Sequence, residues 1–238
     1  MKTSFFVLFV FGLQAFASTM INGSIERVID GDTVVFAPQG SLPNNQVDPM
    51  DGGKNPHVRM VGMDTPETHL QVEGGVYDQG PIAKAATRQL EKFLMTGVNK
   101  VTLEHMGYDK YKRTLGRIFK GGRDIHLEMI RSGYAVTYFL CIVSEGCNGN
   151  FFQENKAKEY IAACNEAKME GRGIWDPADP LEEMPFEFRM RMQGRKPDRY
   201  VGDYVTKKLY QPSDYNKVSP CNRIFFYNKS DANQLGYK

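Results

Sequence analysis

Three short stretches of this chain place acidic and basic side chains where they could act together on a phosphate group. The first, V-R-M-V-G-M-D-T-P-E-T at residues 58–68, carries an arginine inside a strand-like apolar run and two acids around a proline. The others are V-I-D-G-D-T-V-V-F at residues 28–36 and D-K-Y-K-R-T-L-G-R at residues 109–117. Hydrolysis of a phosphodiester needs a hard cation held by carboxylates, cationic side chains that neutralise the developing charge, and a base for water. Together the three stretches offer a candidate for each part.

Arg59 and Arg113 suit the cationic role, because a planar guanidinium matches two phosphate oxygens at once. An arginine inside an apolar strand is costly unless it has a partner. Arg59 is therefore expected to meet a carboxylate or a phosphate.

Each stretch also has a purely structural explanation. Asp30-Gly31 between two apolar runs is typical of a hairpin turn, and this leaves Asp32 without a structural role. Asp64, Pro66 and Glu67 have the spacing of a helix start, with Asp64 as the cap, and taken alone this interpretation is favoured. The third stretch, taken alone, is an exposed hairpin.

Composition sets wide bounds on the function. The chain has 238 residues, of which 41% are hydrophobic and 24% charged, as in an ordinary globular protein with one good core. The net charge of +2 is too small to indicate nucleic-acid binding by itself. Any basic surface has to come from local clustering.

The N-terminus is typical of a secretory signal. It has Lys2, an apolar run from Phe5, and the small residues of A-F-A before Ser18. A membrane anchor is the alternative, but the run is well short of the roughly 20 residues that span a bilayer. We expect cleavage after Ala17 and an exported protein, secreted or periplasmic, with no membrane attachment.

Four cysteines, an even number, favour two disulfides in an exported chain. Three pairings are possible for Cys141, Cys147, Cys164 and Cys221. There is no C-x-x-C pair, and the four histidines are not near the cysteines in metal-ligand spacing. A metal, if one binds, is expected to prefer oxygen ligands.

Alternating and helical patterns predict the elements that position these residues. Strand-like runs occur at 24–28, 33–37, 58–63, 100–105 and 115–119. Helices are expected from Pro81, after a cap at Asp124, and from about Phe151 to Gly171. Five short strands with three packed helices predict an α+β fold, mainly β in its core, built on a five-stranded barrel of OB type.

Two segments interrupt this pattern. Residues 38–56 are rich in Gly, Pro, Asn and Asp and predict a long exposed loop. The stretch D-P-A-D-P at 176–180 marks a linker, so we expect a signal at 1–17, a barrel domain at 18–180 and a small C-terminal extension at 181–238. From Glu182 onward the chain has eleven Lys and Arg against seven Asp and Glu.

In their order and spacing, D-G-D-T, R-x-x-x-x-D-T-P-E-T and D-K-Y-x-R-x-L resemble the staphylococcal nuclease, or thermonuclease, family. The resemblance covers Ser24 to Trp175 and includes G-P at 80–81, R-S-G-Y-A at 131–135 and the closing G-I-W. A single D-G-D is a weak signal, but three ordered motifs with matched internal spacing are specific.

The resemblance implies a calcium ion held by the carboxylates of Asp32 and Asp64 and by the backbone carbonyl of Thr65. Glu67 would orient or deprotonate the attacking water, a role that is disputed within the family.

The same resemblance implies that Arg59 and Arg113 bind the phosphate and its transition state. Lys110 and Tyr111 match positions that hold the terminal phosphate of a bound nucleotide. An aromatic residue would stack on a base, and Tyr138 is the candidate, with Phe139 as the alternative.

The C-terminal extension resembles a small module often appended to such nucleases, which opens with Y-V-G and carries a histidine and cysteines for metal. Tyr200-Val201-Gly202 is present, but Tyr210 and Asp214 stand where the histidine and first cysteine are expected. We therefore expect this module to have lost its metal.

Two classes of function are compatible with the fold. As an enzyme, the chain would be a calcium-dependent endonuclease that cuts DNA, RNA or both and leaves a 3′-phosphate and a 5′-hydroxyl, as the resemblance implies. As a binding module, it would be an OB-fold protein that holds nucleic acid without cutting it. Erosion of the site would show at Arg59, Glu67 or Arg113, and all three are intact. The enzyme, acting as a monomer without a protein partner, is the favoured hypothesis.

Overall fold

The computed structural model describes residues 19–43, 55–141 and 154–238. The expected signal, residues 1–17, lies outside these ranges, as do Cys147 and most of the expected 38–56 loop. Within the described ranges, no helix combines the length and apolar character needed to cross a bilayer.

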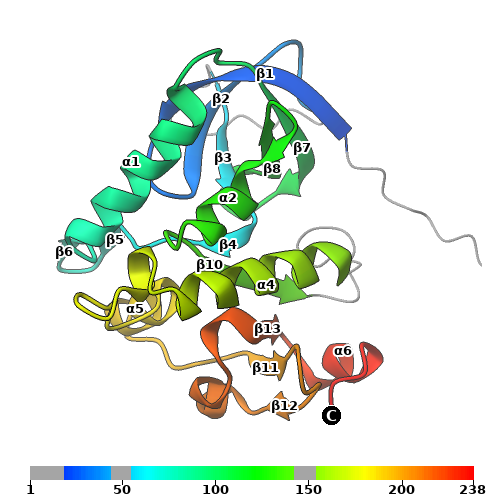
Figure 1. Ribbon diagram of the computed structural model, residues 1–238. Coiled ribbons are helices and arrows are strands. Elements are labelled where there is room, and N and C mark those ends of the chain that lie inside the picture. Colours follow the sequence, from blue (N-terminus) through cyan, green and yellow to red (C-terminus); the bar gives the residue numbers. More distant parts are fainter. Residues whose placement is uncertain (1–18, 44–54, 142–153) are drawn as a thin grey trace, which may run out of the picture.

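Five strands close into a barrel, which lies at the top of Figure 1. They are β1 (Thr19–Val28), β2 (Thr33–Pro38), β3 (His57–Met60), β7 (Val101–Tyr108) and β8 (Thr114–Lys120). β1 pairs antiparallel with β2 and β7, and β3 closes the ring by pairing parallel with β8. The short strand β9 (Arg123–Asp124) continues the sheet beyond β8. The prediction of an α+β fold on a five-stranded OB-type barrel is confirmed.

The barrel closes around apolar side chains that alternate along its strands. Ile25, Phe36, Val58, Leu103 and Ile118 come from the five different strands, and each is at most 1% exposed. Burial of a large aliphatic or aromatic side chain contributes about 1.5–3 kcal/mol, so these residues dominate the stability of the barrel.

The run at 58–63 is not one strand, as expected, but two. β3 ends at Met60, and β4 (Gly62–Asp64) begins after a break at Val61. Gly62 has φ 79°, in the left-handed region that favours glycine, and a Cβ there would lie 3.1 Å from the ring of Tyr160. The turn at Gly62 directs β4, and with it Asp64, out of the barrel and into a second sheet.

The first two expected helices are present. α1 (Pro81–Met95) begins with its proline and buries Ala83, Ala86, Leu90 and Leu94. α2 (Ile125–Arg131) is capped as expected, because the Asp124 carboxylate accepts hydrogen bonds from the backbone N–H groups of His126 and Leu127.

The third expected helix, α4, is described over Glu154–Met169. Its buried stripe at helical spacing consists of Ala157, Tyr160, Ile161, Cys164 and Ala167. In Figure 1, α4 lies between the barrel above and the C-terminal extension below.

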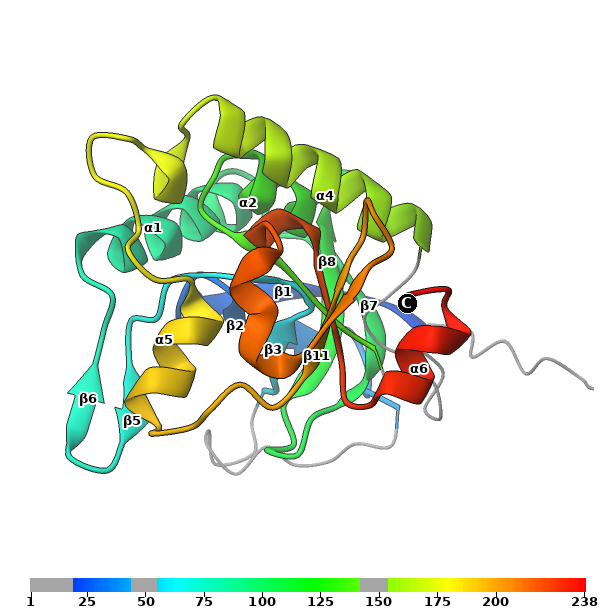
Figure 2. The same ribbon diagram turned by 90° about the horizontal axis from the view of Figure 1, so that it is seen from below.

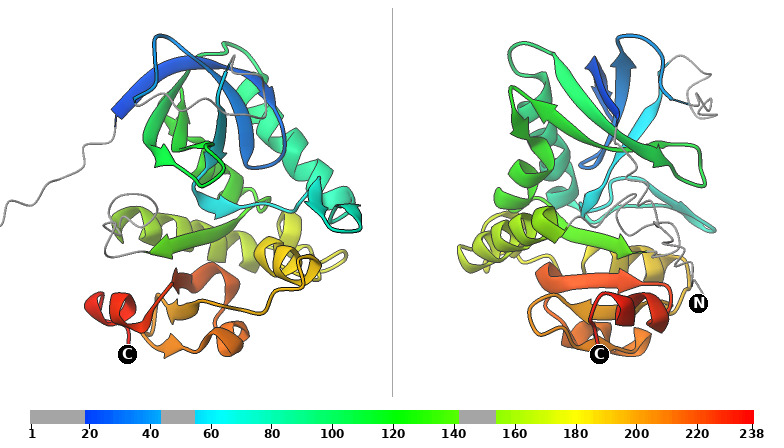
Figure 3. Two further views of the ribbon diagram at one scale, coloured as in Figure 1. Left: turned by 180° about the vertical axis from the view of Figure 1, so that it is seen from behind. Right: turned by 90° about the vertical axis from the view of Figure 1, so that its right-hand side faces the viewer.

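The C-terminal extension, residues 181–238, is joined to the barrel domain by a shared sheet. This sheet has the order β12-β11-β13-β10-β4, and Figure 3 shows it below the barrel. Its new strands are β10 (Val136–Cys141), β11 (Tyr200–Asp203), β12 (Leu209–Tyr210) and β13 (Arg223–Phe226). β13 pairs parallel with β10, and β10 pairs antiparallel with β4. The extension therefore builds on the sheet that carries Asp64.

A disulfide strengthens this junction. Cys164 of α4 bonds Cys221 of the C-terminal extension, and the two Cα atoms lie 5.6 Å apart. Cys141 is disulfide-bonded as well.

The remaining elements are short. The extension adds α5 (Pro185–Met192), the 3₁₀ turns Pro212–Lys217 and Pro220–Asn222, and α6 (Lys229–Gln234); a further 3₁₀ turn, Gly173–Trp175, precedes it. The hairpin of β5 (Leu70–Val72) and β6 (Gly75–Tyr77) lies beside α5 when the molecule is seen from below (Figure 2). Buried apolar residues from Ile21 to Tyr237 form one continuous core.

Candidate active site

Two loops meet at the end of the barrel and bring the first two motifs together. The β1–β2 turn is the expected hairpin, in which the N–H of Ile29 donates to the carbonyl of Thr33. A Cβ on Gly31 would lie 2.5 Å from Oγ1 of Thr65, so only glycine permits this approach of the two loops. The backbone N–H of Thr65 donates to Oδ2 of Asp32 at 3.2 Å. These contacts place Asp32 beside the loop that follows Asp64.

Arg59 lies between the two aspartates. Its Nη1 donates to Oδ1 of Asp32, and its Nη2 donates to Oδ1 of Asp64 at 2.8 Å. Asp32 is 2% exposed and Asp64 is fully buried. Burial acts to lower the pKa of Arg59, but the charges of Asp32 and Asp64 outweigh it and raise that pKa. The expectation of a carboxylate or phosphate partner for Arg59 is confirmed, and the partner is a pair of carboxylates.

The interpretation of D-T-P-E as the start of a helix is wrong. Asp64 is the last residue of β4, and the following residues run without helical structure into β5. Asp64 does not cap a helix, because its carboxylate is already bonded by the guanidinium groups of Arg59 and Arg189.

Glu67 is held through both its backbone and its side chain. Its N–H donates to Oε1 of Gln79 at 3.0 Å. Its carboxylate accepts from Nη1 of Arg189, a residue of α5 in the C-terminal extension. Burial raises the pKa of Glu67 above its usual range, while the charge of Arg189 opposes that shift.

Asp30, Asp32, Asp64 and Glu67 together form an acidic cluster. Burial raises the pKa of Asp30 to about 7, and the neighbouring charge of Asp32 adds to the effect. Arg59 and Arg189 neutralise only part of this negative charge. The cluster therefore favours an additional cation.

The donor chemistry of the cluster fits a hard divalent ion. Asp32 and Asp64 offer buried carboxylate oxygens, and Thr65 adds a backbone carbonyl in the adjoining loop. Among residues 19–43, 55–141 and 154–238, no three His, Cys, Asp or Glu side chains are spaced to enclose a metal on their own. Two carboxylates, a carbonyl and water would suffice for such an ion, so the expected ligand set of Asp32, Asp64 and Thr65 fits the group.

Lys110, Tyr111 and Arg113 lie in the turn between β7 and β8, which we call the basic turn (residues 109–113). The carboxylate of Asp109 organises it by accepting from the N–H groups of Tyr111 and Arg113. Nε of Arg113 also donates to Oδ2 of Asp109, at 2.7 Å. Tyr111 is 57% exposed, and Lys110 lies over its ring. Arg113 is thus held by its own turn and not by the acidic cluster.

Tyr138 lies on β10 and contacts the C-terminal extension. Its hydroxyl accepts from Nη1 of Arg199 at 2.6 Å, and its ring centroid is 5.3 Å from that of Phe225. Phe139, the alternative, is buried in the core against Tyr160. Of the two, Tyr138 is the one that is partly exposed, and base stacking by it stays a prediction.

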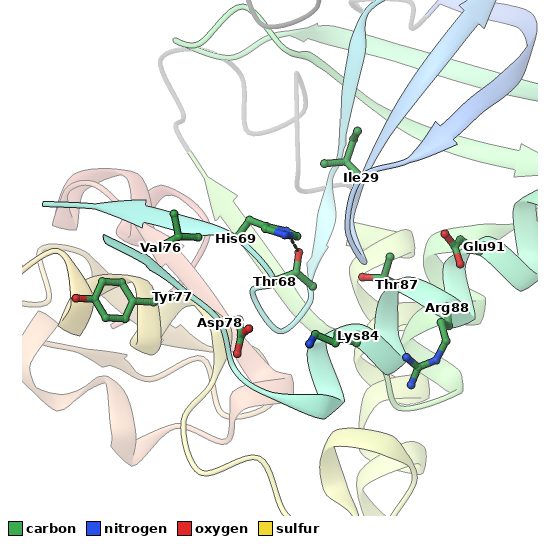
Figure 4. Close-up of a pocket in the computed structure, with 10 residues that line it drawn as sticks. All are labelled: Ile29, Thr68, His69, Val76, Tyr77, Asp78, Lys84, Thr87, Arg88 and Glu91. Atoms are coloured by element: carbon green, nitrogen blue, oxygen red, sulfur yellow. Dashed lines mark hydrogen bonds between the residues drawn. The ribbon is translucent and has the colours of Figure 1, made fainter. Parts of the chain in front are cut away.

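A pocket of about 420 Å³ opens between the Thr68–His69 segment and α1 (Figure 4). The residues that line it include Ile29, which precedes Asp30 in the sequence, and Thr68 and His69, which follow Glu67. Lys84 and Arg88 of α1 supply positive charge on the opposite wall. Asp78 and Glu91 also line the pocket, so its charge is mixed, and a path for substrate along it stays a prediction.

Sequence reasoning missed three residues of this region. Asp30 had been assigned only to a turn, although its carboxylate belongs to the acidic cluster. Gln79 and Arg189 both bond Glu67, although they are 12 and 122 residues away from it in the sequence. The F-E-F-R-M-R-M stretch around Arg189 gives no local signal for this contact, because only the tertiary fold creates it.

Comparisons with known proteins agree with the motifs. The family described as staphylococcal nuclease homologue matches residues 57–177, slightly more than half of the chain. Endonuclease YhcR of Bacillus subtilis (strain 168) is 36% identical over 220 residues, which are 91% of this chain but 16% of that protein. The chain thus spans about a sixth of the length of this relative.

Two further relatives are closer to this chain in length. An uncharacterized endonuclease of Escherichia coli O157:H7 is 28% identical over 176 residues, covering 74% of this chain and 90% of that protein. Thermonuclease of Staphylococcus intermedius is 29% identical over 126 residues, covering 52% of this chain and 65% of that protein.

The matched range contains Arg59, Asp64, Glu67 and Arg113, and the barrel with its buried carboxylates positions the first three of them. The chain belongs to the staphylococcal nuclease homologues.

Proposed function

We propose that this protein is a calcium-dependent endonuclease that hydrolyses phosphodiester bonds of DNA, RNA or both. The observation that carries the proposal is the pair of buried carboxylates, Asp32 and Asp64, with the guanidinium of Arg59 between them. A nuclease needs this combination of cation ligands and phosphate-binding charge. A protein that only binds nucleic acid has no use for buried carboxylates, which repel the backbone.

Asp32, Asp64 and the Thr65 carbonyl would hold the calcium ion. When bound, the cation supplies positive charge beside the scissile phosphate and lowers the pKa of water. Both aspartates are buried and immobilised by hydrogen bonds. Arg59 lies between them, so a cation that both carboxylates bind would require its guanidinium to shift.

Glu67 would accept the proton of the attacking water, or orient that water. A raised pKa suits a general base, because proton transfer is most effective when the pKa of the base lies near the working pH. Arg59 would contact the phosphate from the barrel side, and Arg113 would contact it after turning away from Asp109. The attack displaces the 5′ oxygen and leaves a 3′-phosphate and a 5′-hydroxyl.

A metal panel with analysis of the products tests this function. Purified mature protein would be incubated with plasmid DNA and with single-stranded RNA, in calcium, in magnesium, in zinc and in chelator. We expect cleavage in calcium, poor substitution by the other ions, and none in chelator, since all the ligands are oxygen atoms. Mass spectrometry of the fragments should find 3′-phosphates. Full activity in chelator, or 5′-phosphate ends, would contradict the proposal.

We also propose that the protein is exported. The N-terminal pattern and the bond between Cys164 and Cys221 support this, because disulfides persist mainly outside the reducing cytoplasm. The intact mass of the protein from an exporting host should begin at Ser18 and contain no alkylatable thiol. A mass that begins at Met1 with free thiols would contradict export.

A further inference from the structure

Arg189 joins the two carboxylates that matter most for the proposed chemistry. Its Nη1 and Nη2 donate to Oδ1 and Oδ2 of Asp64, both at 2.8 Å, and Nη1 also donates to Glu67. The side chain is 22% exposed. A bidentate contact of this kind fixes the plane of the Asp64 carboxylate as well as its position.

The helix that carries Arg189 is itself firmly held. Phe186 and Phe188 of α5 are buried. The Glu187 carboxylate accepts from the N–H of Met184 at 3.0 Å and from Nη1 of Arg223 at 2.8 Å. Because the backbone of α5 is fixed by these contacts, the guanidinium of Arg189 is preorganised at the site.

A second contact reaches Glu67 from the same extension. Gln79 accepts from the N–H of Glu67 and donates, through Nε2, to the backbone carbonyl of Glu183 at 2.8 Å. The C-terminal extension therefore holds Glu67 directly through Arg189 and indirectly through Gln79.

The contacts of Asp64 leave one of its acceptor positions unused. A carboxylate has about four acceptor positions. Oδ1 of Asp64 accepts from Arg59 and Arg189, and Oδ2 accepts from Arg189. One acceptor position on Oδ2 is not used by these contacts, so Arg189 can orient Asp64 as a metal ligand, as outer partners of metal sites commonly do, once the groups that cover this buried carboxylate move aside.

We propose that Arg189 is a positioning residue of the nuclease site, and that the C-terminal extension is consequently part of the active site. Arg189 holds Asp64 and Glu67 in the arrangement that catalysis requires. This inference rests on the proposed function, and it assigns a use to the C-terminal extension.

The test compares Arg189→Ala with wild type in calcium, measuring kcat, KM and the Kd of an uncleavable oligonucleotide. We expect kcat to fall about 10- to 100-fold, as for other residues that orient metal ligands. The Kd should change no more than a few-fold, because Arg189 orients carboxylates and does not contact the phosphate. Millimolar guanidinium ion should restore part of the kcat by occupying the vacated place, whereas ammonium at equal ionic strength should not.

Arg191→Ala is the matched control, since Arg191 lies on the same helix but is exposed and pairs with Glu183. It should retain wild-type kcat and show no effect of guanidinium. If Arg189→Ala fails to fold, Arg189→Lys is the substitute. It keeps the positive charge but cannot make the bidentate contact with Asp64, so it should show the same loss of kcat at unchanged Kd.

Three results would overturn the role of Arg189. A rise in kcat would make it an inhibitory plug, a parallel loss of Kd and kcat would make it a phosphate contact, and a loss without rescue that follows a lower melting temperature would make it merely structural. A wild type that cuts nothing would instead overturn the proposed function.

Discussion

The acidic cluster and the basic turn supply opposite charges for one proposed reaction, but the chain builds them in different ways. The cluster is buried and is held by residues from β3, the β1–β2 turn and α5, which lie far apart in sequence. The basic turn is exposed and organised by a single residue of its own, Asp109. The cation ligands are therefore preorganised, whereas the phosphate contacts of the turn can adjust to substrate.

This comparison separates catalytic from structural effects. Changes in the cluster should affect both rate and stability, because breaking one partner of a buried ion pair leaves an uncompensated charge. Changes in the basic turn should affect rate or binding with a smaller loss of stability, because its ion pair between Arg113 and Asp109 is partly exposed and local to the turn.

Arg59→Lys should have the largest combined effect. Lysine keeps the charge but cannot bridge Asp32 and Asp64 as the guanidinium does. We expect kcat to fall about 100- to 1,000-fold, as when one charge-stabilising donor is removed, and the free energy of unfolding to fall by about 1–3 kcal/mol. Steady-state kinetics and urea unfolding would measure both. A variant with normal stability and normal rate would refute the role of the cluster.

Arg113→Ala should lower kcat to a similar extent while lowering the melting temperature less than Arg59→Lys does. Within the described ranges its guanidinium forms an ion pair with Asp109 of its own turn, so its removal leaves one partly buried carboxylate unpaired and not a buried network. Thermal unfolding of Arg113→Ala beside Arg59→Lys gives the direct contrast. A marked loss of stability in Arg113→Ala would show that the basic turn is not independent of the core.

His126 provides a pH-dependent test of the buried region. Its Nδ1 lies 2.7 Å from the carbonyl of Val61, and its Nε2 accepts from the N–H of Ile118 at 3.0 Å. Burial lowers its pKa, since only the neutral ring can accept at Nε2. Its contribution is thus complete above the unfolded value of about 6.5 and declines as pH falls, by at most about 1.4 kcal/mol per pH unit.

Urea unfolding between pH 7.5 and 5.5 would measure this slope. His126→Gln should flatten it, while His69→Gln, which changes an exposed histidine, should leave it as in wild type. An unchanged slope in His126→Gln would mean that other groups cause the acid sensitivity.

The pocket on the α1 side should give the smallest effect. Lys84 and Arg88 are exposed and line this pocket, where we expect them to contact phosphates that flank the scissile bond. We expect Lys84→Ala with Arg88→Ala to raise KM a few-fold, leave kcat unchanged, and reduce the salt dependence of binding by about one unit of slope per contact. Lys92→Ala, elsewhere on α1, should change none of these values. An identical salt slope in all three proteins would indicate that substrate does not follow this pocket.

Local patterns predicted the parts of the structure that local forces determine. The Asp124 cap, the buried stripe of α4 and the five barrel runs follow from hydrogen bonding and periodicity alone. The carboxylate partner of Arg59 followed from the cost of burying a charge. The proximity of Asp32 and Asp64, in contrast, was expected only from the family resemblance, because it depends on the packing of Gly31 against Thr65.

The shared sheet and the partners of Asp64 depend on contacts that no local pattern encodes. The parallel pairing of Phe139 with Ile224 joins strands more than 80 residues apart, so the extension was expected to be an appendage and not part of the sheet of Asp64. D-T-P-E was misinterpreted as a helix start for the same reason, since the two arginines that engage Asp64 come from β3 and α5.

The most direct test of the account is a parallel measurement of turnover and affinity in Glu67→Gln. Glutamine keeps the shape of the side chain but cannot accept a proton from water. With calcium present, kcat should fall by about 100- to 1,000-fold, while the Kd of an uncleavable oligonucleotide should stay within a few-fold of wild type. If wild type cuts neither DNA nor RNA in calcium and Glu67→Gln binds as it does, the protein is a binding module and the catalytic assignment is wrong.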